Sequence, residues 1–287
     1  MKTNALTPHT LRLTRVCLRL FIAVLTVLAF PLQGQVLIED NFNYTTPGGL
    51  AGNTGGTGWT TPYVAIGTSN VEVASGSLDV SITGYQSPNT GNRIGNSSTF
   101  TYTTRAFDSS LATTDGTSYY FSMLINVATI DSNNRVIRLF NTAGGSAVGF
   151  GINASAAGGL IAGINNNNGT EFGDLDWTLG STQLLVGKMT FSDTAGQDRF
   201  DVWLFNDGAD ISLVNWSAST NFVLGDVAPE QGIAFGRGDT LGLYSMDSFR
   251  FSDTVNGVLT TIPEPSTYAL LAVGLTALCV LRRRQGK

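Results

Sequence analysis

The chain has 287 residues, of which 16 are Lys or Arg and 21 are Asp or Glu, with one histidine and two cysteines. His9, Cys17 and Cys279 lie near the two ends, so residues 35–262 contain neither residue type. This excludes from that region a Ser-His-Asp or Cys-His nucleophile, a His-ligated zinc or copper site, and a disulfide. The same region holds 8 Lys and Arg against 20 Asp and Glu, a net charge of −12, which disfavours binding to nucleic acid or anionic membrane surfaces.

Residues 1–34 have the order of features of a secretory signal peptide. Lys2 and three arginines before position 20 form a basic region, and an 11-residue apolar run follows at 20–30. Gly34 is the small residue at which we expect cleavage. The segment therefore predicts export through the inner membrane by the Sec translocon.

Residues 35–251 predict a single all-β domain. Short apolar alternations are separated by Gly, Asn and Asp turns, and 119–127 keeps a period of two throughout. Segments 184–191 and 199–205 flank a polar turn and predict a hairpin. The other expected strands are 36–40, 71–73, 77–82, 99–105, 135–140, 148–152, 160–164, 233–235 and 241–251. With no amphipathic helix expected, the pattern predicts a two-sheet antiparallel sandwich.

Residues 252–262 are expected to link this domain to a C-terminal tail, 263–287. Pro263, Glu264 and Pro265 favour an extended backbone, and residues 268–281 then run for 14 positions without a charge. As a helix this run would measure about 21 Å, against a hydrocarbon core of about 30 Å. Three arginines, Arg282, Arg283 and Arg284, follow at once in the positive-inside pattern. We expect a short transmembrane helix with a basic stop.

This tail resembles the PEP-CTERM sorting signal of Gram-negative bacteria, in which a Pro-Glu-Pro motif precedes a short apolar helix and a basic end. The resemblance implies export to the periplasmic side, recognition by a membrane-bound exosortase, and cleavage near Pro263, Glu264 and Pro265. Delivery to the cell surface or an extracellular matrix would follow, so contact with the inner membrane would be transient. The alternative is a permanent single-pass anchor that retains the tail.

Three parts of the predicted domain resemble bacterial surface proteins with a laminin-G/concanavalin-like jelly roll. They are segments 42–59, 186–191 with 200–206, and 246–251. The resemblance implies a jelly-roll sandwich in which the first and last strands pair, which would place residues 36–42 beside Phe249.

A sandwich of this kind also raises the hypothesis of glycoside hydrolysis. Retaining glycosidases place two carboxylates about 5–5.5 Å apart. In the nearest candidate segment, 171–177, Asp174 and Asp176 share a strand face, but Glu171 and Asp174 fall on opposite faces. The segment also departs from the Glu-x-Asp-x-x-Glu pattern of the related hydrolases. We therefore expect no catalytic residue and a non-enzymatic protein.

For a metal site or a sugar-binding site the sequence offers only loose candidate residues. Oxygen-rich segments at 131–134 and 206–210 allow a structural Ca²⁺, although Asp and Asn are also ordinary turn residues, so no ligand is assigned and no other cofactor is expected. Trp59 and Trp177 are the candidates for stacking on a sugar ring. Trp203 lies on an apolar strand and is equally compatible with a core position.

Taken together, these patterns favour an exported cell-surface or extracellular-matrix protein with a structural or adhesive role in a biofilm or exopolysaccharide layer. The alternative is a carbohydrate-binding module, and a carboxylate-dependent glycosidase is a third hypothesis. The expected partners are the Sec translocon and an exosortase during export, and extracellular polysaccharide afterwards.

Overall fold

The computed structural model describes residues 36–67, 71–87, 91–95, 101–108, 111–129, 134–139, 147–152, 160–165, 171–175, 178–194, 197–211, 218–222, 232–237 and 244–259. The chain divides into two compact units, Met1–Gln33 and Gly34–Lys287, and every described residue belongs to the second. The predicted cleavage residue Gly34, the Pro-Glu-Pro motif and the three terminal arginines lie outside the described residues. Within the ranges above, no helix is long and apolar enough to cross a membrane.

The larger sheet has nine strands, and each of its named pairings is antiparallel. Its order from one edge is β14 (Ala218–Phe222), β13 (Asp198–Phe205), β12 (Thr182–Thr190), β7 (Ser118–Val127), β16 (Tyr244–Ser252), β5 (Arg93–Gly95), β4 (Glu72–Ala74) and β2 (Gly48–Gly49), while β1 (Val36–Asp40) also pairs with β16. β12 and β13 form the hairpin that the sequence predicts, with Leu184 opposite Phe205 and Thr190 opposite Arg199.

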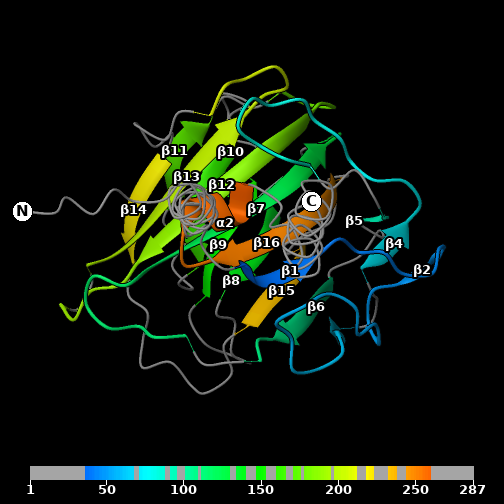
Figure 1. Cartoon of the computed structure of the whole chain (residues 1–287), viewed down its shortest axis with the longest axis horizontal. Helices are drawn as coiled ribbons and strands as arrows, with labels where there is room; N and C mark the ends of the chain where they lie inside the picture. The colour runs from blue at the N-terminus through cyan, green and yellow to red at the C-terminus, as the bar shows by residue number, and fades with distance from the viewer. Residues whose placement is uncertain are drawn as a thin grey trace, which may run out of the picture. The chain divides into compact units, whose positions relative to one another are not determined.

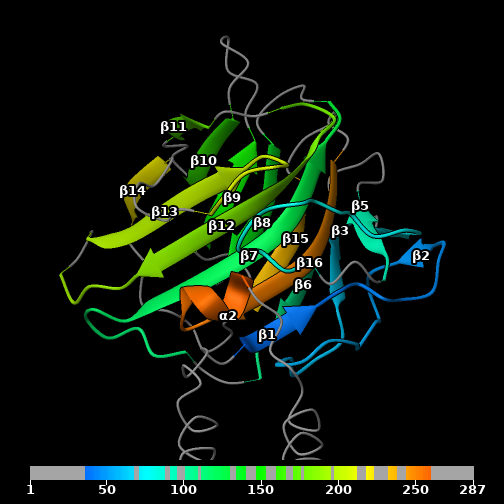
Figure 2. The ribbon, with the colours of Figure 1, turned by 45° about the horizontal axis from the view of Figure 1, so that its top comes forward.

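The smaller sheet has seven antiparallel strands. Their order is β11 (Glu171–Leu175), β10 (Leu160–Asn165), β9 (Ala147–Ile152), β8 (Asn134–Leu139), β15 (Gly232–Arg237), β6 (Thr101–Ala106) and β3 (Val64–Gly67). Figure 2 shows the two sheets as separate layers, with β12, β7 and β16 in front of β8, β15 and β6. The expected all-β, two-sheet antiparallel sandwich is therefore confirmed.

Alternation along the central strands builds the core between the sheets. On β7 the five residues of the predicted period of two are all buried, and they share one cluster with Ile233 and Phe235 of the opposite sheet. The β7 residues are Tyr119, Phe121, Met123, Ile125 and Val127. The ring of Phe121 also occupies the space above Gly187 on β12, where a Cβ would lie 1.9 Å from the ring. Only glycine fits at that position beside this ring.

The outer face of the nine-stranded sheet carries a second apolar cluster. Leu124, Leu184 and Val186 point outward from β7 and β12 and pack against Val80, Ile82 and the helix α2 (Val255–Leu259). α2 lies over β7 and β16, as Figure 1 shows. The middle of this sheet is thus buried on both faces, which explains why its strands are more apolar than half-exposed strands need to be.

Two stretches on this outer face depart from simple sequence expectations. Residues 77–82, predicted as a strand, form none; instead residues 77–87, which we term the strap, cross the sheet and cover the outward leucines and valines. Asp247 holds the start of the strap, because its Oδ2 accepts hydrogen bonds from Ser77 Oγ at 2.5 Å and from the Leu78 amide at 2.8 Å. Residues 255–259, inside the predicted linker, form α2, so the folded region continues at least to Leu259.

The first and last strands of the domain pair as the jelly-roll resemblance implies. Asp40 of β1 lies opposite Phe249 of β16, and Val36 lies opposite Ser252. The register between β16 and β7 shifts between Asp247 and Arg250, and Ser248 has a φ of +58°. This bulge lets both Asp247 and Arg250 face the outer side, where each is fully buried beneath covering segments.

Candidate functional site

The end of β1 and the loop at 55–57 border a partly open pocket of about 240 Å³, which we call the β1 pocket. Glu39 and Thr57 exchange backbone hydrogen bonds of 3.1 and 2.9 Å, which fixes the loop against the strand. The approach is close enough to require glycine at two loop positions. A Cβ at Gly56 would lie 2.4 Å from the Glu39 carbonyl oxygen, and one at Gly58 would lie 2.0 Å from that of Leu37. Both glycines also have a positive φ, near 78°.

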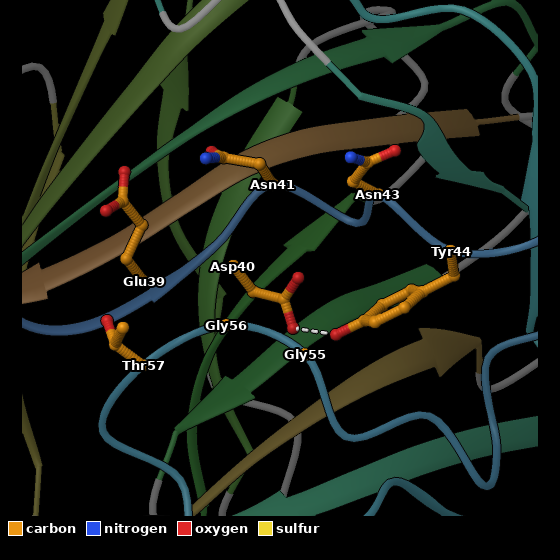
Figure 3. Close-up of a pocket in the computed structure, with 8 residues that line it drawn as sticks. All are labelled: Glu39, Asp40, Asn41, Asn43, Tyr44, Gly55, Gly56 and Thr57. Carbon is orange, nitrogen blue, oxygen red and sulfur yellow. Dashed lines mark hydrogen bonds between the residues drawn. The ribbon is translucent and has the colours of Figure 1, made fainter.

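Figure 3 shows the side chains that line this pocket. Asp40 points toward the Tyr44 hydroxyl, while Glu39, Asn41 and Asn43 point away from this Asp40–Tyr44 contact. The split follows from the geometry of β1, since successive side chains on a strand face opposite sides. The complete lining is Glu39, Asp40, Asn41, Asn43, Tyr44, Gly55, Gly56 and Thr57.

Asp40 anchors one wall and uses both of its carboxylate oxygens. Oδ1 accepts from the Phe42 amide at 2.8 Å, while Oδ2 accepts from Tyr44 Oη at 2.5 Å and Tyr63 Oη at 2.9 Å. Arg105 Nη1 completes the set with an ion pair at 3.3 Å. Burial raises the pKa of Asp40 above its ordinary value, and the pKa values of both tyrosines are raised by burial and by the neighbouring carboxylate.

Arg105 is buried behind this wall, and two of its nitrogens donate to backbone carbonyls. Nε donates to the Thr61 carbonyl at 2.7 Å and Nη1 donates to the Gly55 carbonyl at 2.6 Å. The guanidinium carbon also lies 4.8 Å from the ring centre of Trp59 and 4.7 Å from that of Tyr63. The arginine therefore ties β6, the loop and β1 together through one buried cation.

The opposite wall depends on a second buried arginine. Arg250 Nε donates to Glu39 Oε1 at 3.2 Å, and Nη1 donates to the Gln86 carbonyl of the strap at 3.1 Å. The Arg250 side chain is fully buried, while that of Glu39 remains 31 % exposed. Asn41 Oδ1 is buried beside Glu39 and accepts no hydrogen bond from a described residue. Glu39, Asn41 and Asn43 thus provide the acceptors and amide donors available at the mouth of the pocket.

The pocket is better suited to binding than to acid–base chemistry. Asp40 is committed to four donors, and Glu39, its neighbour on the opposite strand face, is paired with Arg250. Two carboxylates placed in this way do not face a common substrate bond, as a glycosidase pair must. Carboxylate and amide groups beside a tyrosine ring are suited to the hydroxyl groups and apolar faces of a sugar.

The tryptophans considered from sequence for sugar stacking differ in how far the structure describes and buries them. Trp59 is half-buried: its Nε1 donates to the Glu39 carbonyl at 3.2 Å, and its ring packs near Phe107 and Phe249. Stacking on a glycan therefore stays a prediction for the part of this ring that remains exposed. Trp177, like Asp176, lies outside the described residues. Trp203 is a core residue, 4 % exposed in the outer apolar cluster.

The oxygen-rich segments considered for calcium show no metal centre in the described ranges. There, no group of three or more His, Cys, Asp or Glu side chains is close enough to hold an ion. In segment 206–210, Asp207 Oδ1 accepts from the Ser81 amide at 2.6 Å, so this aspartate joins the β13 turn to the strap. Positions 131–133 of the other segment lie outside the described residues.

Sequence reasoning did not identify the cluster formed by Asp40, Tyr44, Tyr63 and Arg105. One signal was present: Arg105 falls on an inward position of the strand predicted at 99–105, where a charge needs a buried partner. The partner itself could not be named, because Asp40 is 65 residues away in the chain.

Comparisons with known proteins identify the tail and give only distant likenesses for the sandwich. Residues 261–285 match the PEP-CTERM protein-sorting motif. A comparison with curated protein sequences gave no match. The motif implies an exported protein that an exosortase recognises and that is sorted to the cell surface.

Three solved structures illustrate the likeness of the fold. The globular domain of T. cruzi calreticulin has a TM-score of 0.47 at 12 % identity, covering 87 % of this chain and 100 % of its own. Domain 4 of AbnA, a GH43 extracellular arabinanase from Geobacillus stearothermophilus, solved with arabinotriose, has a TM-score of 0.47 at 12 % identity, with coverages of 80 % and 100 %. Lectin II from Ulex europaeus has a TM-score of 0.44 at 14 % identity, with coverages of 76 % and 99 %. At these scores the likenesses carry no argument about what this chain binds.

Proposed function

We propose that this protein is a non-enzymatic component of the bacterial cell surface or extracellular matrix, with a structural or adhesive role in an exopolysaccharide layer. The observation that carries the proposal is the PEP-CTERM match at 261–285, since this motif concerns sorting of exported proteins. The two ends direct export and sorting. The N-terminal signal peptide ends at Gly34. At the other end an exosortase cleaves near Pro263, Glu264 and Pro265, and the basic residues Arg282, Arg283 and Arg284 stop transfer through the inner membrane.

The residue types present and the pairing of the pocket carboxylates support the non-enzymatic part of this proposal. Residues 35–262 contain no His or Cys, and the two carboxylates of the β1 pocket are committed to buried partners. Robust release of reducing ends from any polysaccharide by the purified exported protein would overturn it.

The intact mass of the mature protein from the native cell tests the processing step. A C-terminus near Pro263 and an N-terminus near Gln35 are expected. A retained Lys287 would show a permanently anchored protein and would contradict cleavage, while leaving the export step intact.

The second candidate function is carbohydrate binding, and the β1 pocket favours it. Glu39, Asn41 and Asn43 present acceptors and amides around a cavity of about 240 Å³ with the Tyr44 ring on one side. A glycan array with the exported protein, and with Asn43→Ala, Trp59→Ala and Trp177→Ala, would test it. Binding that is lost in Asn43→Ala would support the pocket, whereas an absence of binding with and without Ca²⁺ would leave only the structural role.

A further inference from the structure

A second cavity, of about 260 Å³, lies on the outer face of the nine-stranded sheet, at the end away from β14. We call it the β4–β7 groove; its lining includes Glu72, Ala74, Arg93, Gly95, Asn126 and Ser245. Their strand neighbours Val73, Ile94, Ile125 and Met246 all belong to the core between the sheets. Because side chains alternate along a strand, the groove residues point outward, in the part of the sheet where β4 and β5 continue beyond β16 (Figure 1).

The groove is a continuous cross-strand row rather than a chance gathering. Glu72 lies opposite Gly95, Gly95 opposite Ser245, Ser245 opposite Asn126, and Asn126 opposite Thr182. The row crosses five strands, or about 19 Å at the usual spacing between strands. Gly95, between Glu72 and Ser245, has no side chain, so the backbone itself forms the floor at that point of the row.

Arg93 stands beside this row and is held in a defined position. Its Nη1 donates to the carbonyls of Ser75 at 2.7 Å and Gly76 at 3.0 Å, at the segment that leads into the strap. The other three arginines with described side chains each pair with a carboxylate, at 3.3 Å for Arg105, 2.7 Å for Arg199 and 3.2 Å for Arg250. Arg93 forms no ion pair with any described residue, although residues 35–262 carry a net charge of −12.

The row indicates the class of ligand. It lies on a sheet face, where the backbone groups are already used in the strand ladder, so a peptide cannot bind there by adding a strand. The one aromatic residue of its described lining, Tyr244, belongs to the core between the sheets, so the described lining forms no apolar pocket for a peptide side chain. Hydroxyl, amide and carboxylate groups in a line instead match a chain of sugar rings, and a fixed guanidinium matches a carboxylate on one of them.

We propose that the β4–β7 groove binds a linear polysaccharide that contains uronic acid, with Arg93 contacting a uronate carboxylate and Ser245 and Asn126 contacting ring hydroxyls. Asn126 Nδ2 donates to the Gly180 carbonyl at 3.0 Å and to Thr182 Oγ1 at 3.4 Å, which fixes the Asn126 amide beside the groove. Glu72, on the same row, faces a hydroxyl rather than a second carboxylate. The inference rests on the proposed function to the extent that an exported matrix protein meets such chains outside the cell.

The test is calorimetric titration of the purified full-length protein with hexasaccharides of galacturonate, mannuronate and glucuronate, each compared with its methyl ester. The ester keeps the sugar chain and removes the negative charge. At least one acid should bind about ten-fold or more tightly than its ester, the size expected for a charge-assisted contact. Arg93→Gln should abolish this preference, and Glu72→Gln should strengthen binding of the acid by removing a like charge.

Arg199→Gln is the matched control, because it makes the same change in charge on β13, outside the groove lining. It should leave the ratio of acid to ester affinity unchanged, and Arg93→Lys should lose part of the ratio because it loses the planar fork. Thermal unfolding of each variant checks that the fold is intact. Loss of the Arg93 bonds to Ser75 and Gly76 could loosen that turn, but loosening alone would weaken acid and ester equally and leave their affinity ratio unchanged.

Three results would overturn the proposed polysaccharide site: no binding of any of the three acids, equal binding of acid and ester, or an equal loss of the acid-to-ester affinity ratio in Arg93→Gln and Arg199→Gln. The proposed function fails differently. Release of reducing ends from a bound hexasaccharide would refute the non-enzymatic role, even if binding followed Arg93.

Discussion

At the scale of single residues, buried charges organise both walls of the β1 pocket. Asp40 and Arg105 have side chains 2 % and 3 % exposed, and each has several further hydrogen-bond partners. An ion pair of this kind stabilises the fold little compared with an apolar pair, but removing one partner leaves an uncompensated buried charge. We therefore expect positions 40 and 105 to tolerate substitution poorly for reasons of stability alone.

Arg105→Met should lower the free energy of unfolding by about 3–5 kcal/mol, because Asp40 loses its cation inside the fold. Urea unfolding at neutral pH measures the loss. The control is Arg199→Met, whose side chain is 52 % exposed and whose ion pair with Asp201 is screened by solvent, so its loss should be about 1 kcal/mol or less. Similar losses in the two variants would show that the Asp40 cluster is not the anchor described above.

Asp247 predicts a pH dependence of stability. Burial raises its pKa from 3.8 to about 6, against the opposing effect of donors at Ser77, Leu78 and Ser248. Because the raised pKa means tighter proton binding in the folded state, this contribution is fully present below about pH 4 and is lost as the pH rises through about 6. Its size is about 3 kcal/mol at most. The free energy of unfolding from urea titrations should therefore fall between pH 4 and 7.

Two variants isolate Asp247 in that measurement. Asp247→Asn should flatten the fall between pH 4 and 7, leaving the part that comes from Asp40, whose pKa is also raised by burial. Ser77→Ala removes a donor that stabilises the charged carboxylate, so it should move the fall to higher pH. An unchanged slope in Asp247→Asn would assign the pH dependence elsewhere.

At the scale of elements, period-two alternation predicted the long strands well. β1 was predicted with its observed bounds, and β7, β12, β13 and β16 within about three residues. The strands not predicted are short or lack an apolar alternation, namely β2, β3, β5, β11 and β14. Such strands form because a neighbouring strand offers a free edge, which is a property of the assembled sheet and not of their own residues. Residues 77–82 show the reverse case: they alternate, yet they lie across a sheet that has no free edge there.

The helix α2 is the element whose role the sequence least indicated. Its Leu259 is 5 % exposed and closes the outer cluster together with Val258, whose carbonyl accepts from Ser122 Oγ at 2.6 Å. Leu259→Ala should lower the free energy of unfolding by about 2–4 kcal/mol, because it leaves a cavity above β7 and β16. Val255→Ala, at a half-buried position of the same helix, should cost less in the same denaturant titration. Equal, small effects would mean that residues 255–259 behave as a linker after all.

At the scale of the whole molecule, the chain combines a β-sandwich with a C-terminal PEP-CTERM sorting motif. Charge is divided accordingly: eight of the 16 basic residues lie outside 35–262, and that region is left with a net charge of −12. Such a charge favours solubility after export and opposes non-specific association with anionic surfaces. Arg93, which pairs with no carboxylate among the described residues, is therefore a local exception in an acidic stretch of sequence.

Replacing Pro263, Glu264 and Pro265 together by alanine should block processing, because the PEP-CTERM match includes all three. The variant should remain in the inner-membrane fraction with Lys287 retained, whereas Asp253→Ala, an exposed residue outside the matched range, should be processed normally. Cell fractionation with intact mass measurement distinguishes the two. Normal release of the triple variant would remove the motif from the processing step.

The sorting motif, the chemistry excluded from residues 35–262 and the all-β fold class all follow from the linear sequence. A sorting motif is a linear string, an absent histidine is absent in any fold, and a period of two in apolar residues predicts strands where neighbouring strands can pair. The grouping of residues into one site follows from the three-dimensional fold instead. Asp40 meets Arg105 across 65 residues, Glu39 meets Arg250 across 211, and the row from Glu72 to Thr182 crosses five strands. These contacts depend on strand order and register, which arise from non-local pairing and core packing, so the local sequence can mark a residue such as Arg105 as needing a partner but cannot name the partner.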